Sequence, residues 1–259
     1  MIKEKENTEP AVEADKKGVI IEIKDLHKTF GKDNHVLKGV NFTVNKGEDL
    51  VVLGRSGSGK SVTIKCIVGL ITPDKGEINV FDENVLDLNK TELNEMRARI
   101  GFLFQSGALY DSMSVRENLA FTLRKHKREL TADEIEKEVL EALDSVGLSD
   151  AIDKMPSELS GGMRKRIGLA RTLILKPEII LYDEPTTGLD TITSREISEL
   201  ILDIKHTRKT TAIIITHDMA CAKLTADRII VLKEGKIQAE GTYEELEKSE
   251  DEWVRSFFE

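Results

Sequence analysis

Short apolar runs recur along most of the chain, and each is bounded by glycine, proline or polar residues. Runs that alternate apolar with polar residues, or that stay apolar over about five positions, are typical of half-buried and buried strands. Asn45-Lys46-Gly47 and Glu234-Gly235 provide turns between neighbouring runs. The pattern predicts strands over residues 19–24, 39–44, 48–53, 76–80, 100–104, 179–182, 211–216, 228–232 and 236–240.

Other segments show helical spacing, and they alternate with the strands. Residues 61–70 are predicted to form a helix that ends at a Thr72-Pro73-Asp74 turn. Residues 114–127 and 132–146 are predicted to form two further helices. Thr131 and Glu134 form a capping box at the start of the last of these. Because strands that alternate with helices pair in parallel, we expect a mostly parallel α/β sheet, with residues 106–160 inserted into it as a helical block.

The length and composition describe an ordinary globular protein. The 259 residues, 39% hydrophobic and 33% charged, suffice for one large domain or for a core with a subdomain. The net charge of −9 argues against a nucleic-acid backbone as the main partner, since such a partner requires a basic face. Most of this charge is local: residues 240–259 carry −6 and residues 1–17 carry −1, which leaves −2 for the rest.

Two cysteines, Cys66 and Cys221, lie in apolar, helix-like contexts. They are too few for a disulfide framework or a metal cluster, so we expect buried free thiols in a reducing compartment. The sequence contains no apolar run of about 18 residues that could span a membrane. Residues 1–17 lack the apolar core of a signal peptide and are predicted to form a disordered arm, which favours a cytosolic protein.

The first segment that indicates chemistry matches G-x-x-x-x-G-K-[ST], between an apolar strand and a helix. Its glycines let successive backbone N–H groups point at phosphate oxygens, and the helix N-terminus adds its positive dipole end. Lys60 would reach the β- and γ-phosphates, and the Ser61 hydroxyl would take a Mg²⁺ position. The predicted nucleotide-binding residues are Gly54, Arg55, Ser56, Gly57, Ser58, Gly59, Lys60, Ser61 and Val62.

A second segment, Ile-Ile-Leu-Tyr-Asp-Glu-Pro over residues 179–185, leads a buried strand directly into two acids. In parallel sheets such a strand delivers a carboxylate to the carboxyl edge, where ligands bind. Asp183 is predicted to hold Mg²⁺ through water, and Glu184 to polarise the attacking water. The alternative is that the two acids only cap the next turn, which is less consistent with a P-loop in the same chain.

A third segment, Leu-Ser-Gly-Gly-Met-Arg-Lys-Arg over residues 159–166, precedes a helix. Ser160, Gly161 and Gly162 offer an N-cap hydroxyl, bare backbone and the helix dipole, which together form an anion cradle. The alternative interpretation is an ordinary helix cap without a ligand.

The order of these segments along the chain is similar to that of a known protein family. A P-loop, Gln105, Leu-Ser-Gly-Gly, Asp-Glu and then His217 at a strand end resemble the ATP-binding-cassette (ABC) ATPase family over about residues 19–245. The resemblance implies a P-loop NTPase fold over residues 18–245. Its parts would be a RecA-like parallel-sheet core, an N-terminal antiparallel β subdomain and an inserted α-helical subdomain at about 106–160.

The resemblance also implies roles for residues in the chain's own ATP site. Phe30 stands where an aromatic ring stacks on adenine; the alternative is a core phenylalanine. Gln105 resembles the glutamine that touches Mg²⁺ and water and that reports the nucleotide state to a membrane partner. His217 resembles the histidine that contacts the γ-phosphate. The remaining histidines are read as structural: His27, His35, His126 and His206.

Other roles implied by the resemblance act on a second chain. Ser160 and Gly162 would bind the γ-phosphate held by the opposite subunit, and Asp190 resembles the acid that crosses the dimer interface. Met163 departs from the family, where glutamine is frequent, but it leaves the Ser-Gly-Gly cradle intact. Since this chain holds one P-loop and one cradle, two copies arranged head to tail should sandwich two ATP molecules, each with Mg²⁺.

Local matches narrow the resemblance further. Residues 104–118, 159–166 and 183–194 are similar to the ATPase of Mla-type (MCE-associated) phospholipid transport systems. Residues 253–258, within the aromatic tail at 246–259, are similar to the C-terminal tail of that group. In that group the tail reaches across the dimer, and the partners are a membrane permease, a small STAS-domain protein and an MCE-domain protein. The resemblance implies a peripheral protein on the cytoplasmic face of the bacterial inner membrane. The alternative for the tail is an end that packs on its own domain.

Competing functions remain open at this point. The chain could serve an ABC transporter for another substrate. A nucleic-acid-associated cassette is disfavoured, because the sequence has neither a tandem second cassette nor a long coiled coil nor a basic stripe. A catalytically inactive binding module is disfavoured because Lys60, Asp183, Glu184 and His217 are all present.

Overall fold

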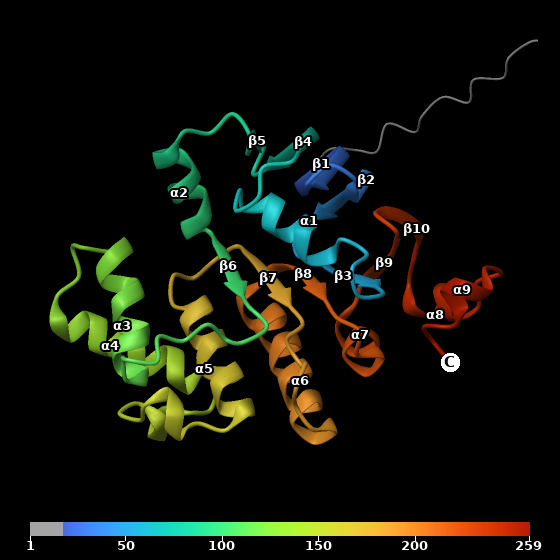
Figure 1. Cartoon of the computed structure of the whole chain (residues 1–259). Helices are drawn as coiled ribbons and strands as arrows, with labels where there is room; N and C mark the ends of the chain where they lie inside the picture. The colour runs from blue at the N-terminus through green and yellow to red at the C-terminus, as the bar shows by residue number, and fades with distance from the viewer. Residues whose placement is uncertain (1–17) are drawn as a thin grey trace, which may run out of the picture.

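The computed structural model describes residues 18–259, so the arm predicted at 1–17 lies outside the described residues. A six-stranded sheet crosses the centre of the molecule in the order β10-β9-β3-β8-β7-β6 (Figure 1). All neighbours pair in parallel except β10, which is antiparallel to β9 at one edge. These strands span Asp49–Gly54 (β3), Ile100–Leu103 (β6), Ile179–Asp183 (β7), Thr211–Ile215 (β8), Arg228–Lys233 (β9) and Lys236–Gly241 (β10).

A second, antiparallel sheet lies at the N-terminal end in the order β2-β1-β4-β5. Its strands span Val19–Phe30 (β1), Asn34–Asn45 (β2), Lys75–Val80 (β4) and Glu83–Asn84 (β5). The first two are about twice as long as the strands predicted from the sequence, because irregularities in their register interrupt the apolar alternation. One such irregularity falls at Asp25, whose φ of 46° is left-handed.

Helices cover both faces of the parallel sheet and form the predicted insertion. Capping boxes at Ser114 and Thr131 begin the two main helices of the insertion, α3 and α4. The bounds are Lys60–Ile67 (α1), Lys90–Ala98 (α2), Val115–His126 (α3), Ala132–Asp144 (α4), Gly161–Leu173 (α5), Thr191–Arg208 (α6), Met219–Thr225 (α7), Tyr243–Glu247 (α8) and Glu252–Arg255 (α9), with short 3₁₀ turns at Ser149–Ala151 and Pro156–Glu158.

Helix α2 has no counterpart in the sequence expectation. Met96 is its one buried residue, so the helix lacks the apolar stripe by which an amphipathic helix is recognised. Its beginning is set locally: the Asn89 side chain accepts from the backbone of Glu92, whose carboxylate accepts from the backbone of Asn89. A polar surface helix of this kind is defined by its cap rather than by its hydrophobic pattern.

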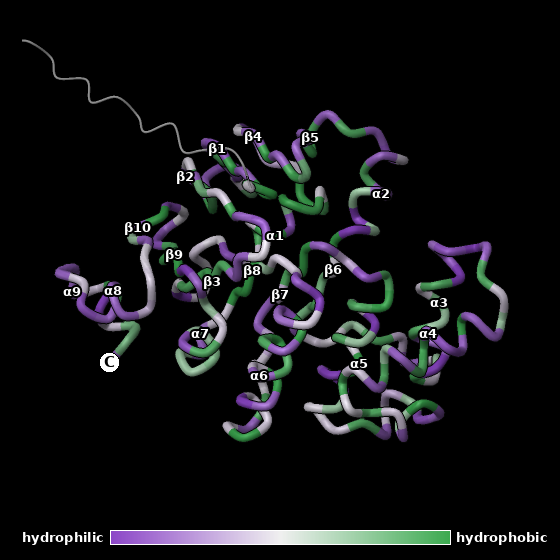
Figure 2. The backbone as a smooth tube through the Cα atoms, turned by 180° about the vertical axis from the view of Figure 1, so that it is seen from behind, coloured by the Kyte–Doolittle hydropathy of each residue, from purple (hydrophilic) through white to green (hydrophobic). Residues whose placement is uncertain are grey.

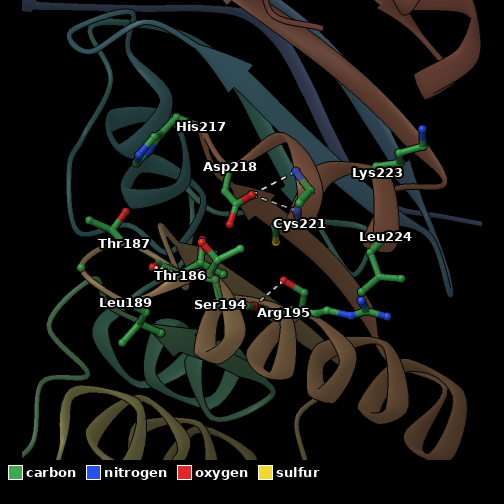
Figure 3. Close-up of a pocket in the computed structure, with 14 residues that line it drawn as sticks. Thr186, Thr187, Leu189, Ser194, Arg195, His217, Asp218, Cys221, Lys223 and Leu224 are labelled. Carbon is green, nitrogen blue, oxygen red and sulfur yellow. Dashed lines mark hydrogen bonds between the residues drawn. The ribbon is translucent and has the colours of Figure 1, made fainter. Parts of the chain in front are cut away.

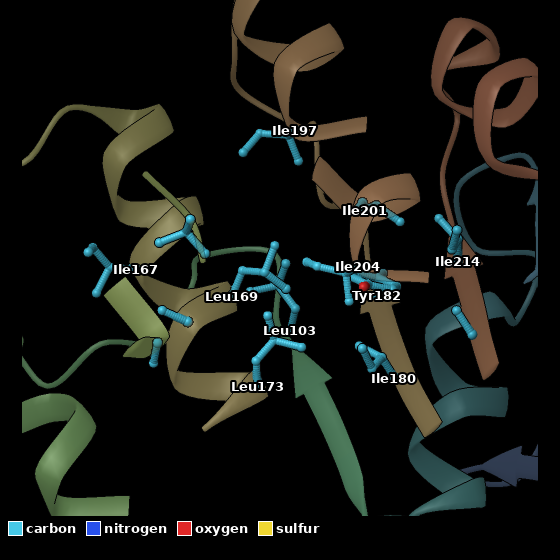
Figure 4. Packing of buried hydrophobic residues seen from close by; sticks show 14 of the residues in the cluster. Leu103, Ile167, Leu169, Leu173, Ile180, Tyr182, Ile197, Ile201, Ile204 and Ile214 are labelled. Carbon is cyan, nitrogen blue, oxygen red and sulfur yellow. The ribbon is translucent and has the colours of Figure 1, made fainter. Parts of the chain in front are cut away.

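The parallel sheet is buried on both faces, and its strands are correspondingly apolar throughout. In β3, Val51 and Leu53 face one cluster of buried residues, while Leu50 and Val52 face the other. The first cluster joins the sheet to α5 and α6, where Leu169 and its neighbours pack on the strands (Figure 4). The second joins it to α1 and the N-terminal sheet. Figure 2 shows the central strands as hydrophobic and the outer α9 as hydrophilic.

Both cysteines are buried and free, as predicted. Burial raises the pKa of the Cys66 and Cys221 thiols to about 11, so the reactive thiolate is scarce at neutral pH. Within residues 18–259, no helix has the length and apolar character needed to cross a membrane.

A buried carboxyl group lies at the start of β3, far along the strand from the P-loop. Asp49 is fully buried, and within the described residues its oxygens accept no hydrogen bond. The nearest cation is Lys205, whose Nζ lies 3.6 Å from Oδ2. Burial raises the pKa of Asp49 to about 7, against the opposing effect of Lys205.

This raised pKa predicts a pH-dependent stability. Since the native state holds the Asp49 proton more tightly than the unfolded chain, the free energy of unfolding should fall as pH rises from about 4 to 7. Asp49→Asn removes this loss, so the variant should be more stable than the wild type at pH 8, by at most roughly 4 kcal/mol. Urea unfolding should show a smaller difference in the free energy of unfolding between Asp49→Asn and the wild type at pH 5 than at pH 8. Equal differences at the two pH values would contradict the prediction. The matched control is Asp33→Asn, at an exposed aspartate.

Candidate functional site

The P-loop joins β3 to α1 and adopts a glycine-dependent path. Gly54 has φ 154°, and a Cβ there would lie 2.5 Å from the carbonyl oxygen of Leu232. Gly59, with φ 107°, forms the N-cap of α1, and a Cβ there would lie 2.6 Å from the Leu37 side chain. Other residues therefore cannot replace these two glycines without moving β9 or β2. The loop consequently brings bare backbone to the N-terminus of α1, which is the arrangement that binds phosphate.

Lys60, at the start of α1, places its ammonium group beneath this loop. The side chain is buried, and its Nζ donates to the carbonyl oxygen of Gly54 at 2.7 Å and to that of Arg55 at 3.2 Å. Burial lowers the pKa of Lys60, while Glu184 and Asp183 nearby act in the opposite direction. The Ser58 hydroxyl in the same loop is buried and, among the described residues, has no hydrogen-bond partner.

Two of the three predicted Mg²⁺ residues, Ser61 and Asp183, lie in contact. Ser61 Oγ donates to Asp183 Oδ1 at 2.8 Å, although 122 residues separate them in sequence. The contact follows from the topology, because β3 and β7 both adjoin β8 and end at the same edge of the sheet. A hydroxyl and a carboxylate oxygen form the hard donor set that Mg²⁺ prefers, so the residues present fit this ion.

Glu184 follows Asp183 and has an unusual backbone. Its φ of 54° is left-handed, a conformation that is strained for a residue with a side chain. Its N–H donates to the carbonyl oxygen of Ile215 at 2.9 Å. On the carboxylate, Oε2 lies 2.7 Å from His217 Nδ1 and accepts from Thr187 Oγ1 at 3.1 Å. The sequence motifs predict Glu184 and His217 as site residues but carry no signal for Thr187, which lies three residues after Glu184.

The loops after β7 and β8, together with helices α6 and α7, line an open cavity of about 770 Å³. Figure 3 shows Thr187, Leu189 and His217 at one side of it, and Lys223 and Leu224 at the other. His217 is 67% exposed in its side chain, so the histidine that contacts Glu184 also reaches the surface of the molecule. The site is therefore open on this face.

The Ser-Gly-Gly segment begins α5 as predicted. Ser160 is the N-cap, and its Oγ accepts from the N–H of Met163 at 3.2 Å. A Cβ on Gly162 would lie 2.6 Å from Thr193 on α6, whereas Gly161 is exposed. Figure 1 shows α5 beside α3 and α4, well away from α1, and Figure 2 agrees from behind. The helix that begins at Ser160 and the helix that follows the P-loop therefore lie apart in both views.

The remaining predicted residues occupy defined positions. Phe30 is 40% exposed at the end of β1, which excludes the alternative of a core phenylalanine. Gln105 is exposed in the loop after β6, and its carbonyl oxygen accepts from Lys165 Nζ. Asp190 caps α6 by accepting from the N–H groups of Ile192 and Thr193, a structural role that the sequence analysis did not assign. Arg55, Ser56 and Gly57 are exposed, and Val62 is partly buried.

The C-terminal tail packs on its own domain in this single chain. Val254 on α9 is fully buried, and Asp251 caps the helix while accepting from Gln238 of β10 at 2.7 Å. The Trp253 ring lies beside the P-loop, 4.4 Å from Lys233 Nζ and 5.9 Å from the Arg55 guanidinium carbon. The arrangement agrees with the alternative interpretation of the tail, an end that packs on its own domain.

Comparison with known families and proteins agrees with this geometry. The sequence pattern of the ABC transporter family matches residues 37–187, which include the P-loop, the Ser-Gly-Gly segment and the Asp-Glu pair. A probable ribonucleotide transport ATP-binding protein, mkl, from Mycobacterium leprae is 41% identical over 240 residues, covering 93% of this chain and 69% of that protein. The intermembrane phospholipid transport system ATP-binding protein MlaF from Haemophilus influenzae is 40% identical over 239 residues, covering 92% and 89%.

A solved structure provides a comparison of the fold. An ATP-binding cassette dimer in a post-hydrolysis state, bound to ADP and phosphate, superposes with a TM-score of 0.79 at 32% identity. The match covers 86% of this chain and 98% of that one. The site geometry, the family pattern and these relatives lead to one conclusion: the chain belongs to the ABC transporter family and is an ATP-hydrolysing subunit.

Proposed function

We propose that this chain hydrolyses ATP to power phospholipid transport at a bacterial inner membrane, as a homodimer bound to a membrane permease. The observation that carries the proposal is the close contact of Ser61 with Asp183 and of Glu184 with His217, in a chain 40% identical to a phospholipid transport ATP-binding protein. Transport of ribonucleotides is the second candidate, because a relative with that probable function is 41% identical.

The proposed mechanism assigns one task to each group in the chain's own site. The P-loop N–H groups and Lys60 bind the phosphates, and the Phe30 ring stacks on adenine. Ser61, Gln105 and Asp183 hold Mg²⁺, which would neutralise charge on the phosphate oxygens. Glu184 orients the attacking water, and His217, which contacts Glu184, faces the γ-phosphate. Catalysis then depends on positioning and on charge stabilisation.

The second cradle requires another copy of the chain. In the proposed dimer, Ser160, Gly161 and Gly162 of one copy bind the γ-phosphate held by the P-loop of the other. Two features support a contact between the copies on the face that carries His217 and Ile192. One is the open cavity beside His217, and the other is Ile192 itself, which is 74% exposed next to Asp190. Loss of the γ-phosphate would remove the link between the two copies, so they would separate after hydrolysis.

A groove beside Gln105 supports a permease contact. It has a volume of about 380 Å³ and lies between β6 and α3. Tyr110 and Phe121 are both exposed there and contact edge to face, with centroids 5.4 Å apart, and Arg171 lies over Tyr110. Exposed aromatic rings with a cation are typical of protein interfaces. We propose that a permease segment binds in this groove and senses the loop of Gln105.

The tail at 246–259 is proposed to contact a partner as well as its own domain. Replacing Trp253 and Phe257 together with alanine leaves Val254 buried but removes the edge-to-face aromatic pair. We expect the dimer formed with ATP to dissociate several-fold more readily, as sedimentation velocity can measure. A lower unfolding midpoint with unchanged dimer affinity would show that the tail serves only its own domain.

A small STAS-domain protein and an MCE-domain protein are proposed as further partners.

The proposed function is tested by purifying the chain from native membranes in mild detergent and identifying the proteins and lipids that accompany it. We expect a permease and an MCE-domain protein, with phospholipid enriched over the bulk membrane. A permease accompanied by a soluble substrate-binding protein, with hydrolysis stimulated by ribonucleotides, would favour the second candidate. RNA or DNA retained at physiological salt would contradict both.

A further inference from the structure

Lys165 is a buried cation in the segment over residues 159–166, and the motif gives it no role. It lies on α5, five residues after Ser160, and only 6% of the residue is exposed. Its Nζ donates to the carbonyl oxygen of Gln105 and, at 3.1 Å, to the carbonyl oxygen of Glu184. A buried ammonium group is costly unless it is hydrogen-bonded. These two bonds therefore fix where both loops can lie relative to α5.

The two loops belong to different parts of the site. Gln105 follows β6 and leads into the helical insertion, whereas Glu184 follows β7 and carries the proposed catalytic carboxylate. The Glu184 backbone is left-handed, so it requires support from its surroundings. Three bonds provide that support: its N–H donates to the carbonyl oxygen of Ile215, and its carbonyl oxygen accepts from Lys165 Nζ and, at 3.3 Å, from the N–H of Thr187.

The charge of Lys165 also complements the site. Burial lowers the pKa of Lys165, while the Glu184 and Asp183 carboxylates favour its charged form. Burial and the same two carboxylates act in the same directions on the pKa of Lys60. The charges of two buried lysines are thus favoured by the same two acids. Because Lys165 is on the helix that begins at Ser160, a displacement of α5 would be felt directly at Glu184.

We propose that Lys165 is a positioning residue for hydrolysis, which joins the Gln105 and Glu184 loops to α5 so that the Glu184 carboxylate is held in line for the attacking water. The inference rests on the role proposed above for Glu184. In the dimer, Lys165 would connect the cradle that serves the partner's ATP to the carboxylate that serves the chain's own ATP. Neither phosphate nor water needs to touch Lys165 for this.

The test is a series of variants of the full chain, measured as kcat for phosphate release and, separately, as affinity for a fluorescent ATP analogue. Lys165→Met keeps the length but removes all donors, Lys165→Gln keeps an amide donor, and Lys165→Arg keeps the charge. We expect Lys165→Met to lower kcat by roughly 10- to 100-fold, since small misplacements at a reacting centre have effects of this size. Nucleotide affinity should change less than about threefold. Activity should rise from Met to Gln to Arg.

Controls separate this role from a purely structural one. Lys137→Met makes the same change at an exposed lysine on α4 and should retain wild-type kcat. If Lys165→Met and Lys165→Gln lose kcat and nucleotide affinity in proportion to their loss of thermal stability, the proposal is overturned. It is also overturned if Lys165→Met turns over ATP as fast as the wild type. If Lys165→Met does not fold, the same criterion applies to Lys165→Gln. Glu184→Gln is assayed in parallel: normal turnover there would refute the proposed role of Glu184 itself.

Discussion

Replacing Glu184 with glutamine is expected to reduce ATP hydrolysis by about 10²- to 10⁴-fold, the usual effect of removing a general base. ATP binding should be retained, because the P-loop, Lys60 and the Ser61–Asp183 contact do not involve the Glu184 side chain. With the γ-phosphate preserved, two copies should remain joined through their cradles. Sedimentation velocity with ATP should therefore find a stable dimer of the variant, and phosphate-release assays should find almost no turnover.

The isosteric substitution makes this result specific. Glutamine keeps the size of the side chain and can still accept from Thr187 Oγ1, as Glu184 does at 3.1 Å. Glu199→Gln is the matched control, because Glu199 lies on α6 and pairs with Arg195 at the surface. Turnover near the wild-type rate in Glu184→Gln would refute its role, and so would loss of ATP binding.

Lys60→Met should instead abolish activity at the binding step. The methionine side chain has similar length but cannot donate to phosphate, and charge-assisted hydrogen bonds of this kind are among the strongest in proteins. We expect the affinity for an ATP analogue to fall by roughly 100-fold, which corresponds to about 2.7 kcal/mol. Calorimetry or fluorescence titration measures this directly, and no dimer should form at ATP concentrations that saturate the wild type.

Lys65→Met is the control for Lys60→Met, because Lys65 lies on the same helix but outside the P-loop. Its nucleotide affinity should equal that of the wild type. Wild-type affinity in Lys60→Met itself would mean that the loop backbone alone binds the nucleotide.

The contrast between local and non-local signals explains how much of the site could be predicted. The P-loop, the Asp-Glu pair and the Ser-Gly-Gly cap are continuous segments whose chemistry depends on near neighbours in sequence. The contacts of Ser61 with Asp183 and of Glu184 with His217 followed once the strands were known to be parallel, since their carboxyl ends meet at one edge. The mostly parallel sheet and the helical insertion could be predicted as well, because hydrophobic periodicity separates strands from helices along the chain.

Features without a local signal were missed. Lys165 reads as one of several basic residues in Met-Arg-Lys-Arg, and only packing shows that it alone among them is buried against two loops. Helix α2 has no apolar stripe, and Asp190 has no sequence feature that separates a cap from a dimer contact. The aromatic tail is a similar case: its composition indicates a docking segment, but not whether it docks on its own chain.

The central claim, that each ATP is held by the P-loop of one chain and the Ser-Gly-Gly cradle of another, is tested most directly by mixing two inactive variants. Lys60→Met destroys the P-loop but leaves its cradle, and replacing Ser160 with a bulky phenylalanine blocks the cradle but leaves the P-loop. In a mixed dimer, one ATP site combines the impaired P-loop of Lys60→Met with the blocked cradle of Ser160→Phe. The other ATP site combines the intact P-loop of the Ser160→Phe chain with the intact cradle of the Lys60→Met chain. The account predicts that mixing restores ATP hydrolysis, which neither variant shows alone. No recovery, from variants that still form mixed dimers, would contradict it.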